Sequence, residues 1–115
     1  MPASTVWAQV ALTDADTVYN LYTLLTAIDS TMPIRCCELI LSAVETNNPV
    51  SIGSSSMSTD GAIYGMRIQG QTTPLAGIER AVHFTHEGNT IHLKSFYLMG
   101  VTTAAMHVNV CVTVR

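Results

Sequence analysis

Histidines are the side chains of this chain best suited to hold a metal ion, so their spacing is considered first. His83 and His86 form an H-x-x-H pattern in a segment that alternates like a β-strand, where residues three apart lie on opposite faces and cannot bind one ion. His83 and His92 become diagonal neighbours if the segment between them is a tight hairpin. Two histidines without a third ligand make a weak site, so surface histidines are favoured over a metal enzyme that uses this pair.

The signatures of other chemistries are missing from the sequence. Nucleophilic catalysis needs a Ser or Cys beside a His and an orienting acid, and no nucleophile elbow marks such a group. Asp14 and Asp16 form a close carboxylate pair, but they precede an amphipathic segment whose helix they can cap. The glycines follow neither the G-x-G nor the Walker spacing of phosphate-binding loops. We therefore expect no enzyme activity, no catalytic residues, no cofactor, no metal and no small-molecule substrate.

The low content of charged residues is the strongest compositional signal. Charged side chains make up 11% of the 115 residues and apolar ones 48%, whereas roughly 25% charged residues is usual for a globular protein. Thr, Ser, Asn and Gln take the place of the missing charges. Because a soluble monomer usually keeps a charged surface, this composition favours a subunit whose surface is covered by neighbours in an assembly. A secreted β-protein with a Thr/Ser-rich surface is the alternative.

Net charge and hydropathy limit the partners and the compartment. The net charge of −3, with five basic residues dispersed along the chain, argues against DNA or RNA. No apolar run is long enough to span a bilayer. The first ten residues lack the basic and apolar regions of a signal peptide, so the protein is expected to be made, and kept or assembled, in a cytoplasm. A chain of this length is expected to be one domain, residues 1–115, with its own core.

Three cysteines, an odd number, argue against a disulfide framework in a chain without a recognisable signal peptide. Cys36 and Cys37 are adjacent and lie on opposite faces of a strand, so they are not expected to pair with each other. We interpret these two residues and Cys111 as buried thiols. A disulfide or zinc site shared between subunits is a weaker alternative.

The periodicity of apolar residues predicts a mostly-β domain: an antiparallel β-sandwich, jelly-roll-like, with one short α-helix near residues 15–28. Residues 5–12 and 106–114 alternate between apolar and polar positions, as half-buried strands do. Residues 34–44 are apolar on both faces and are expected to form one long strand that is covered on both sides. Turn residues separate the shorter strands expected at 50–53, 63–68 and 96–100.

Residues 81–95, AVHFTHEGNTIHLKS, carry the clearest hairpin pattern. A two-residue turn at Gly88-Asn89 would pair Phe84 with Leu93 and gather the apolar residues on one face. A three-residue loop would mix the two faces, so the shorter turn is favoured.

Interface residues are expected where apolar side chains have no cover of their own. Trp7 lies on the polar face of its strand, where a large aromatic often marks a contact surface, although the chain's own helix or loop could cover it equally well. The doubly apolar strand adds Cys37, Leu39 and Leu41 as candidates. Arg35, a further candidate, and Glu38 break the apolar pattern of this strand and could pair across an edge or an interface.

A resemblance to a known class of proteins rests on the segment PVSIGSSSMSTDGAIYGMRIQGQTTPL. A strand ending in V-x-I-G, a short Ser/Thr loop, and a glycine-led strand followed by a Thr-rich segment resemble small β-sandwich structural proteins of tailed bacteriophages. The matching pieces cover about two thirds of the chain, and their motifs are loose. They are residues 35–43, 49–53, 65–68 and 95–100.

The resemblance implies a non-enzymatic virion structural protein. A capsid decoration (cement) protein that stabilises the phage head through subunit contacts is favoured. It would form a homo-oligomer, with a trimer favoured, and contact other virion proteins such as the major capsid protein. Its location would be the virion, assembled in the host cytoplasm. A collar, neck or tail protein of the same particle is the first alternative.

Two other functions stay open. A carbohydrate- or receptor-binding β-sandwich module would use Trp7, Tyr64, Tyr97 and the loop of residues 54–58, because aromatic rings stack on sugar faces. A small enzyme with a cupin-like metal site would use His83 together with a second histidine, His92.

Overall fold

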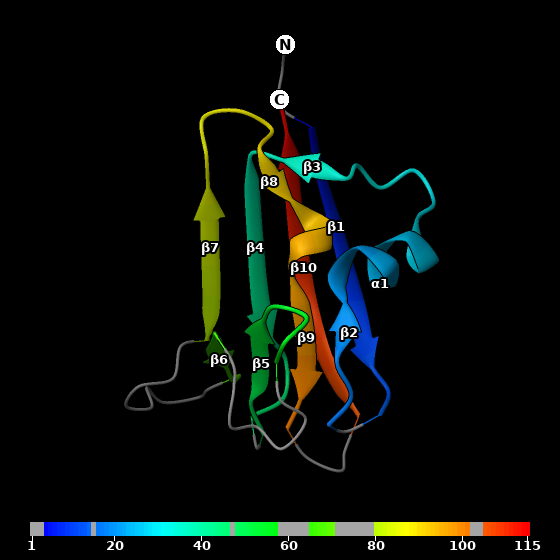
Figure 1. Ribbon diagram of the computed structural model, residues 1–115, viewed down its shortest axis with the longest axis vertical. Helices are drawn as coiled ribbons and strands as arrows, with labels where there is room; N and C mark the ends of the chain where they lie inside the picture. The colour runs from blue at the N-terminus through cyan, green and yellow to red at the C-terminus, as the bar shows by residue number, and fades with distance from the viewer. Residues whose placement is uncertain (1–3, 15, 47, 58–64, 71–79, 102–104) are drawn as a thin grey trace.

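The part of the chain that the structure describes forms two four-stranded antiparallel sheets that face one another, with a two-stranded sheet and one short α-helix beside them (Figure 1). The computed structural model describes residues 4–14, 16–46, 48–57, 65–70, 80–101 and 105–115. For these residues the predicted mostly-β, antiparallel fold with a single short α-helix is confirmed. Within the same ranges, no helix has the length and apolar character needed to cross a membrane.

Sheet A contains the two longest strands. β1 (Ser4–Leu12) pairs with β10 (Met106–Val114) along its full length, and β10 pairs on its other side with β4 (Glu38–Ala43). β7 (Ala81–Thr85) lies beyond β4, which gives the order β1-β10-β4-β7 with every neighbouring pair antiparallel. The two alternating segments predicted from the sequence are thus adjacent strands that turn one side to the core and the other outward.

Sheet B has shorter strands in the order β2-β9-β5-β6. Two of them, β5 and β9, lie where the sequence predicts strands. The strand predicted at 63–68 begins at Met66 in the described part of the chain, and residues 63 and 64 lie outside that part. The four strands are β2 (Tyr19–Asn20), β9 (Tyr97–Gly100), β5 (Val50–Gly53) and β6 (Met66–Ile68).

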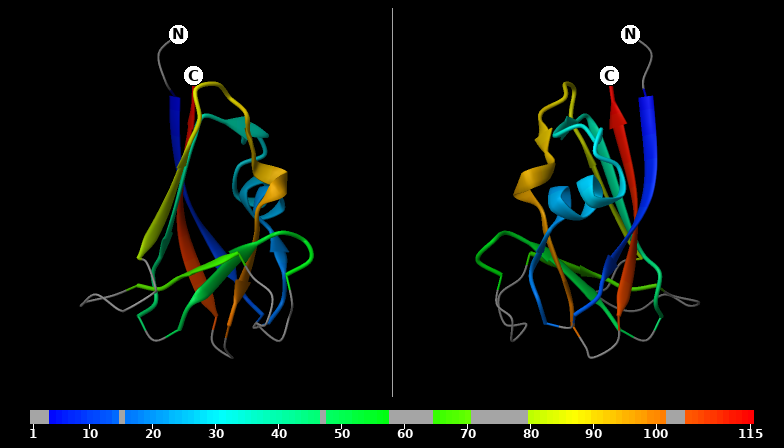
Figure 2. Two further views of the ribbon diagram at one scale, coloured as in Figure 1. Left: turned by 60° about the vertical axis from the view of Figure 1, so that its left-hand side comes forward. Right: turned by 90° about the vertical axis from the view of Figure 1, so that its right-hand side faces the viewer.

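The strand pairs are nested along the chain. β1 pairs with β10, β2 with β9, β4 with β7 and β5 with β6, from the outermost pair to the innermost. Two further pairings, β10 with β4 and β9 with β5, join these pairs into sheets A and B. Figure 2 shows the two layers edge-on, with the helix on the β1 side of the sandwich.

The apolar run expected as one strand from residue 34 to 44 is divided into two strands, so that prediction is wrong. β3 (Arg35–Cys36) pairs with β8 (Ile91–His92) in a separate two-stranded sheet, whereas β4 belongs to sheet A. Cys37 lies at the break, where its N–H donates a hydrogen bond to the carbonyl of Thr113. The first half of the run therefore turns away to close one end of the sandwich.

The hairpin predicted at 81–95 is also wrong. β7 pairs with β4 and β8 pairs with β3, so the strands on either side of Gly88-Asn89 belong to different sheets. Phe84 lies opposite Leu39 rather than opposite Leu93, which instead begins a buried 3-10 helix, η1 (Leu93–Ser95). The turn residues favour a reversal of the chain, but they do not decide which strand each arm pairs with.

The helix α1 (Leu21–Ile28) is shorter than predicted and begins with a different cap. Asn20 is its N-cap, and the side-chain oxygen of Asn20 accepts a hydrogen bond from the N–H of Thr23 at 3.2 Å. Leu21 and Leu25, one turn apart, are fully buried and fix the helix against the core. The predicted capping by Asp14 or Asp16 is therefore wrong, because β2 lies between those residues and the helix.

The core lies between the sheets and is built from the inward-facing positions of both. β1, β4 and β10 contribute alternate residues, and β5, β6 and β9 contribute the opposite wall. Its largest fully buried side chains include Leu12, Leu21, Leu39, Leu41, Ile68, Leu98 and Met106. Each of these side chains loses nearly all contact with water on folding. This burial stabilises the folded state by roughly 25 cal/mol for each Å² of apolar area removed from water.

Candidate functional site

The outward side of sheet A is the first candidate surface, and we call it the outer face. The strand registers arrange its side chains in rows across all four strands, and the central row runs from Trp7 through Cys111 and Ile40 to His83. Sheet B lies on the opposite side of sheet A, because the alternate residues of these strands form the core. The outer face consists of Thr5, Trp7, Gln9 and Ala11 on β1; His107, Asn109, Cys111 and Thr113 on β10; Glu38, Ile40 and Ser42 on β4; and Ala81, His83 and Thr85 on β7.

Trp7 is the most exposed large apolar side chain of the described residues, with 74% of its surface accessible to solvent. It borders a hollow of about 430 Å³ whose walls include Ile40, Cys111 and Asn109. Ile40 is half-buried, while Cys111 is buried beneath its neighbours. The predicted alternative, in which the chain's own helix or loop covers Trp7, is wrong. An exposed aromatic next to an apolar hollow is a common feature of contact surfaces.

Hydrogen bonds between side chains hold the outer face in place around Trp7. On one side of it, the amide of Gln9 donates to the side-chain oxygen of Asn109 at 2.9 Å. On the other side, the hydroxyls of Thr5 and Thr113 lie 3.2 Å apart, and Thr113 donates to Glu38. These cross-strand bonds fix the rotamers of the polar residues, so the face is ordered before any partner arrives.

Glu38 carries the charge of the outer face, and the His83 ring lies against it. The Nε2 atom of His83 lies 2.9 Å from a carboxylate oxygen of Glu38. The hydrogen bond from His83, supported by that from Thr113, lowers the pKa of the Glu38 carboxyl below its ordinary value of 4.5. The carboxylate therefore stays ionised through the neutral range, and apart from the two histidines the rest of the outer face has no acidic or basic side chain.

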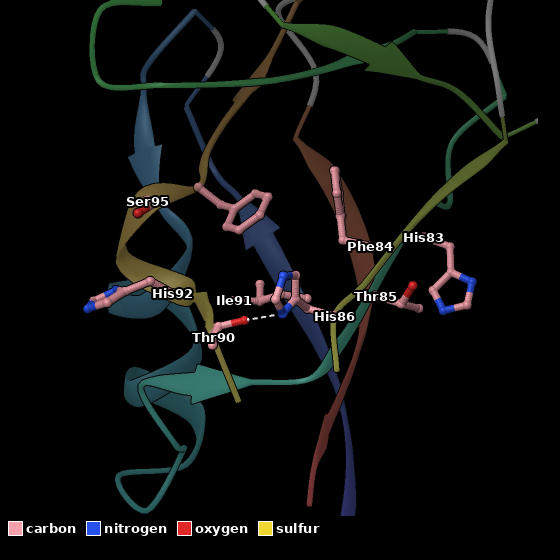
Figure 3. A pocket seen from close by; sticks show the side chains of 9 residues that line it. His83, Phe84, Thr85, His86, Thr90, Ile91, His92 and Ser95 are labelled. Carbon is pink, nitrogen blue, oxygen red and sulfur yellow. Dashed lines mark hydrogen bonds between the residues drawn. The ribbon is translucent and has the colours of Figure 1, made fainter. Parts of the chain in front are cut away.

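A cleft beside β7, at the edge of sheet A, is the second candidate site. It measures about 730 Å³ and lies between β7 on one side and β8 and η1 on the other (Figure 3). The rings of Phe84 and Phe96 meet there with centroids 5.1 Å apart, and Ile91 adds a further apolar wall. His86 and Thr90 meet across the cleft, with Nδ1 and the hydroxyl oxygen 2.6 Å apart. The sequence analysis missed this cleft, because the hairpin it predicted would have closed it.

The structure separates the histidines proposed for a metal site. His83 belongs to sheet A and pairs with Glu38, whereas His92 belongs to β8, and Figure 3 shows the two rings pointing in different directions. The Nδ1 atom of His92 is buried, with no hydrogen-bond partner in the part of the chain that the structure describes. Among the described residues, no three His, Cys, Asp or Glu side chains are grouped to hold a metal ion. The cupin-like arrangement therefore has no geometric support in those residues.

The predicted interface residues divide into two groups. Trp7 is on the surface, and Arg35 is exposed on β3. Leu39 and Leu41 are fully buried in the core, facing sheet B, and Cys37 is 2% exposed. Their side chains are therefore not part of the surface that a folded chain presents to a partner. Ile40, which was not singled out, occupies the outer face in their place.

The residues predicted for a carbohydrate-binding surface are not gathered in one place. Tyr97 is half-buried on β9, in the sheet opposite Trp7. Tyr64 and Ser58 lie outside the described residues, and the remaining part of the loop, residues 54–57, follows β5 in sheet B. Of the described residues in this set, only Trp7 belongs to the outer face.

The three cysteines are free and buried, as expected from the sequence. Burial raises the pKa of the Cys36 thiol to about 11, and the neighbouring Cys37 adds to the effect. Burial also raises the pKa of Cys111. Thiols of this kind are poor nucleophiles and poor metal ligands at neutral pH.

A second pair of residues, also missed from the sequence, joins the end of β4 to the start of β10. A carboxylate oxygen of Glu45 accepts a hydrogen bond from the backbone N–H of His107 at 2.9 Å, and the other lies 2.5 Å from the His107 ring. Burial raises the pKa of Glu45, but these hydrogen bonds outweigh it, so the pKa lies below the ordinary value.

The fold and the two surfaces define a small antiparallel β-sandwich with an ordered, nearly uncharged outer face and a lateral cleft. No family model matches the chain, and no curated protein or solved structure matches it either.

Proposed function

We propose that this chain is a non-enzymatic structural subunit of a virion, with capsid decoration as its favoured role. The single observation that carries the proposal is the outer face, where Trp7 is 74% exposed beside an apolar hollow in a sheet with almost no charge. Such a surface is unfavourable in water and becomes favourable when a neighbouring subunit covers it. A collar, neck or tail protein of the same particle would use the surface in the same way.

The nested strand pairing supports the proposal. Eight strands that pair β1·β10, β2·β9, β4·β7 and β5·β6, and divide between two facing sheets, have the connectivity that we infer to be a jelly roll. Jelly rolls occur in viral capsid proteins, in lectins and in cupins. The connectivity thus agrees with the resemblance to phage structural proteins, while the site must decide among the three classes.

Burial of apolar area would supply the energy of assembly. Covering the exposed part of one Trp side chain removes about 150 Å² from water, which contributes about 3 to 4 kcal/mol before the costs of association. The hydrogen bonds that already order Gln9, Asn109 and Thr113 lower the entropy lost when a partner binds. The proposed partners are further copies of the chain, with a trimer favoured, and other virion proteins such as the major capsid protein.

Light scattering on the purified protein tests the proposal. We expect a trimer or larger oligomer whose mass falls when Trp7 is changed to Ser, because the outer face then loses its aromatic. The matched control is Ile34→Ser, which removes an exposed apolar side chain, 37% accessible, from a site off the outer face. A protein that stays monomeric at every concentration, or an oligomer that responds equally to both changes, would contradict the proposal.

A carbohydrate-binding module is the second candidate, and one observation favours it. Trp7 lies in the same hollow as the hydrogen-bonded amides of Gln9 and Asn109. An aromatic ring flanked by amide groups can stack on a sugar and hydrogen-bond its hydroxyls. A glycan array decides this: specific binding that Trp7→Ser abolishes, from a protein that remains a monomer, would favour the lectin-like function.

A further inference from the structure

Among the described residues, no strand pairs with the outer edge of β1 or of β7 in sheet A. Both free edges lack the features that normally prevent edge strands from pairing. β1 is nine residues long and contains no charged residue, proline or glycine, and the five residues of β7 also contain no Lys, Arg, Asp, Glu, Pro or Gly. Natural edge strands are usually short, charged, bulged or interrupted by proline. Sheet B follows that rule, because its edges β2 and β6 have two and three residues and β6 carries Arg67.

The hydrogen-bonding pattern shows which residues of β1 face the free edge. The carbonyl of His107 bonds to the N–H of Val44, so odd-numbered residues of β10 face β4 and even-numbered ones face β1. In the β1·β10 register even residues pair with even residues. The odd-numbered residues of β1 therefore point their N–H and C=O groups away from the sheet; they are Thr5, Trp7, Gln9 and Ala11.

The same argument applies to β7. The N–H of Ala43 bonds to the carbonyl of Arg80, so the even-numbered residues of β7 face β4. Ala81, His83 and Thr85 therefore direct their backbone groups to the free edge, toward the side of the sandwich that holds the cleft. These three residues of β7 therefore present free backbone groups that can form hydrogen bonds with Thr5, Trp7 and Gln9 of another β1.

We infer that copies of this chain associate head to tail, with β1 of one copy adding to the free edge of β7 in the next. This inference rests on the proposed function and adds a second contact between copies, at the strand edges, to the contact that covers the outer face. β1 and β7 run antiparallel, because each neighbouring pair in the sheet is antiparallel, so the joint continues the same ladder. Continuing the rows of the outer face places Thr5, Trp7 and Gln9 of one copy beside Thr85, His83 and Ala81 of the other.

The second layer of the sandwich fits the same contact. On the β1 side α1 packs against β1 and occupies the second layer (Figure 2). On the β7 side the second layer is hollowed by the cleft, which Figure 3 shows from close by. A copy that adds its β1 edge to β7 therefore brings its α1 side to the mouth of the cleft. The lateral side of the molecule extends 42 Å in one direction and 22 Å in the other. Its area is large enough for a stable interface, which buries roughly 800 Å² on each partner.

The symmetry of the contact follows from its two different edges. A head-to-tail contact repeats until the rotation between copies closes a ring, and the favoured trimer is a ring of this type. A symmetric pairing of two β1 edges would leave the β7 edge and the cleft uncovered, and it would give a dimer. These two arrangements make different predictions for cross-linking.

Proline substitutions test whether the free edges carry the contact. In Gln9→Pro and Ala81→Pro the lost N–H faces the free edge, so the backbone hydrogen bonds within sheet A are kept. Gln9→Pro also removes the side-chain bond to Asn109, which the control Gln9→Ala removes as well. We expect each to raise the dissociation constant of the oligomer about tenfold or more, with the fold retained by circular dichroism. The matched control Gln9→Ala keeps the N–H and should keep the oligomer. Prolines that leave the mass unchanged would overturn the inference.

Cysteine cross-linking tests which edges meet. With diamide as oxidant, a mixture of Thr5→Cys and Thr85→Cys chains should give a disulfide-linked dimer, while each chain alone should not. The Cα spacing of a hydrogen-bonded strand pair, about 5.5 Å, allows such a bridge. A bridge in Thr5→Cys alone, or none in the mixture, would overturn the head-to-tail contact. An oligomer lost in Trp7→Ser but kept in both proline variants contradicts this inference alone, whereas a monomeric wild type contradicts the proposed function as well.

Discussion

Replacing Leu39 and Ile40 by alanine, one at a time, tests which face of β4 belongs to the core. Leu39 is fully buried between Val112 and Phe84 in the register of sheet A, while its neighbour Ile40 is half-buried on the outer face. Leu39→Ala leaves a cavity inside the sandwich and should cost about 3 kcal/mol of the free energy of unfolding. Ile40→Ala opens toward solvent, encloses no cavity and should cost about 1 kcal/mol in the isolated subunit.

These free energies convert to shifts in melting temperature. With an unfolding entropy of about 2.1 cal/mol/K per residue, the 115-residue chain has about 0.24 kcal/mol/K. Leu39→Ala should therefore lower Tm by about 12 °C and Ile40→Ala by about 4 °C. Thermal unfolding followed by circular dichroism at low and high protein concentration gives both values. Because association stabilises the folded state by mass action, the Ile40→Ala loss should grow with concentration if the outer face is an interface.

Two results would refute this reasoning. Equal losses for the two variants at low concentration would mean that both faces of β4 are closed within one subunit. An Ile40→Ala loss that is independent of concentration, in a protein that light scattering shows to be an oligomer, would remove the outer face from the interface. Leu39→Asp, by contrast, is uninformative about assembly, because a charge at this buried position prevents folding.

Three further predictions concern Glu45, the buried thiols and Gly70. The folded-state pKa of Glu45 is depressed, so its stabilising effect is present above pH 4.5 and is lost as the pH falls through the folded value; Glu45→Gln should flatten this acid-side loss in unfolding titrations. The thiols of Cys36 and Cys111 are buried with raised pKa values, so a thiol reagent at pH 8 should label them only after denaturation, and reductant should leave the oligomer mass unchanged. A Cβ at Gly70 would lie 2.6 Å from the carbonyl oxygen of Val44, so Gly70→Ala should cost about 1 to 3 kcal/mol in denaturant unfolding.

The sequence predicts the elements whose burial pattern is regular and local. β10 has the predicted bounds and β1 differs from the prediction by one residue, because each alternates strictly and each covers one side of the core. The helix is predicted only in its second half: the preceding segment has helical spacing, yet Asn20 rather than an aspartate caps it. Residues that can cap a helix are common in this segment. Which of them becomes the N-cap depends on where the chain leaves sheet B, at the end of β2.

Pairing between distant segments is the part that the sequence does not determine. The arms of the predicted hairpin each have a nearby turn and a matching apolar side, so local rules favour joining them. In the fold, β7 completes sheet A through β4, more than thirty residues earlier in the chain, and β8 pairs with β3. The cleft exists because these two arms separate, and no local signal marks the separation.

The candidate interface illustrates the same difficulty on the scale of one residue. A strand with apolar residues at both odd and even positions has two faces that could be buried, and its own sequence is nearly symmetric between them. The neighbouring strands determine which face is buried. Pairing with β10 and β7 places Leu39 and Leu41 against sheet B and leaves Ile40 in the same row as Trp7. Trp7 could be identified from the sequence because its strand alternates strictly, whereas Ile40 required the neighbouring strands. The residues of a surface patch that crosses four strands are therefore determined by the register of those strands. The patch can be identified only when the pairing of all four strands is known.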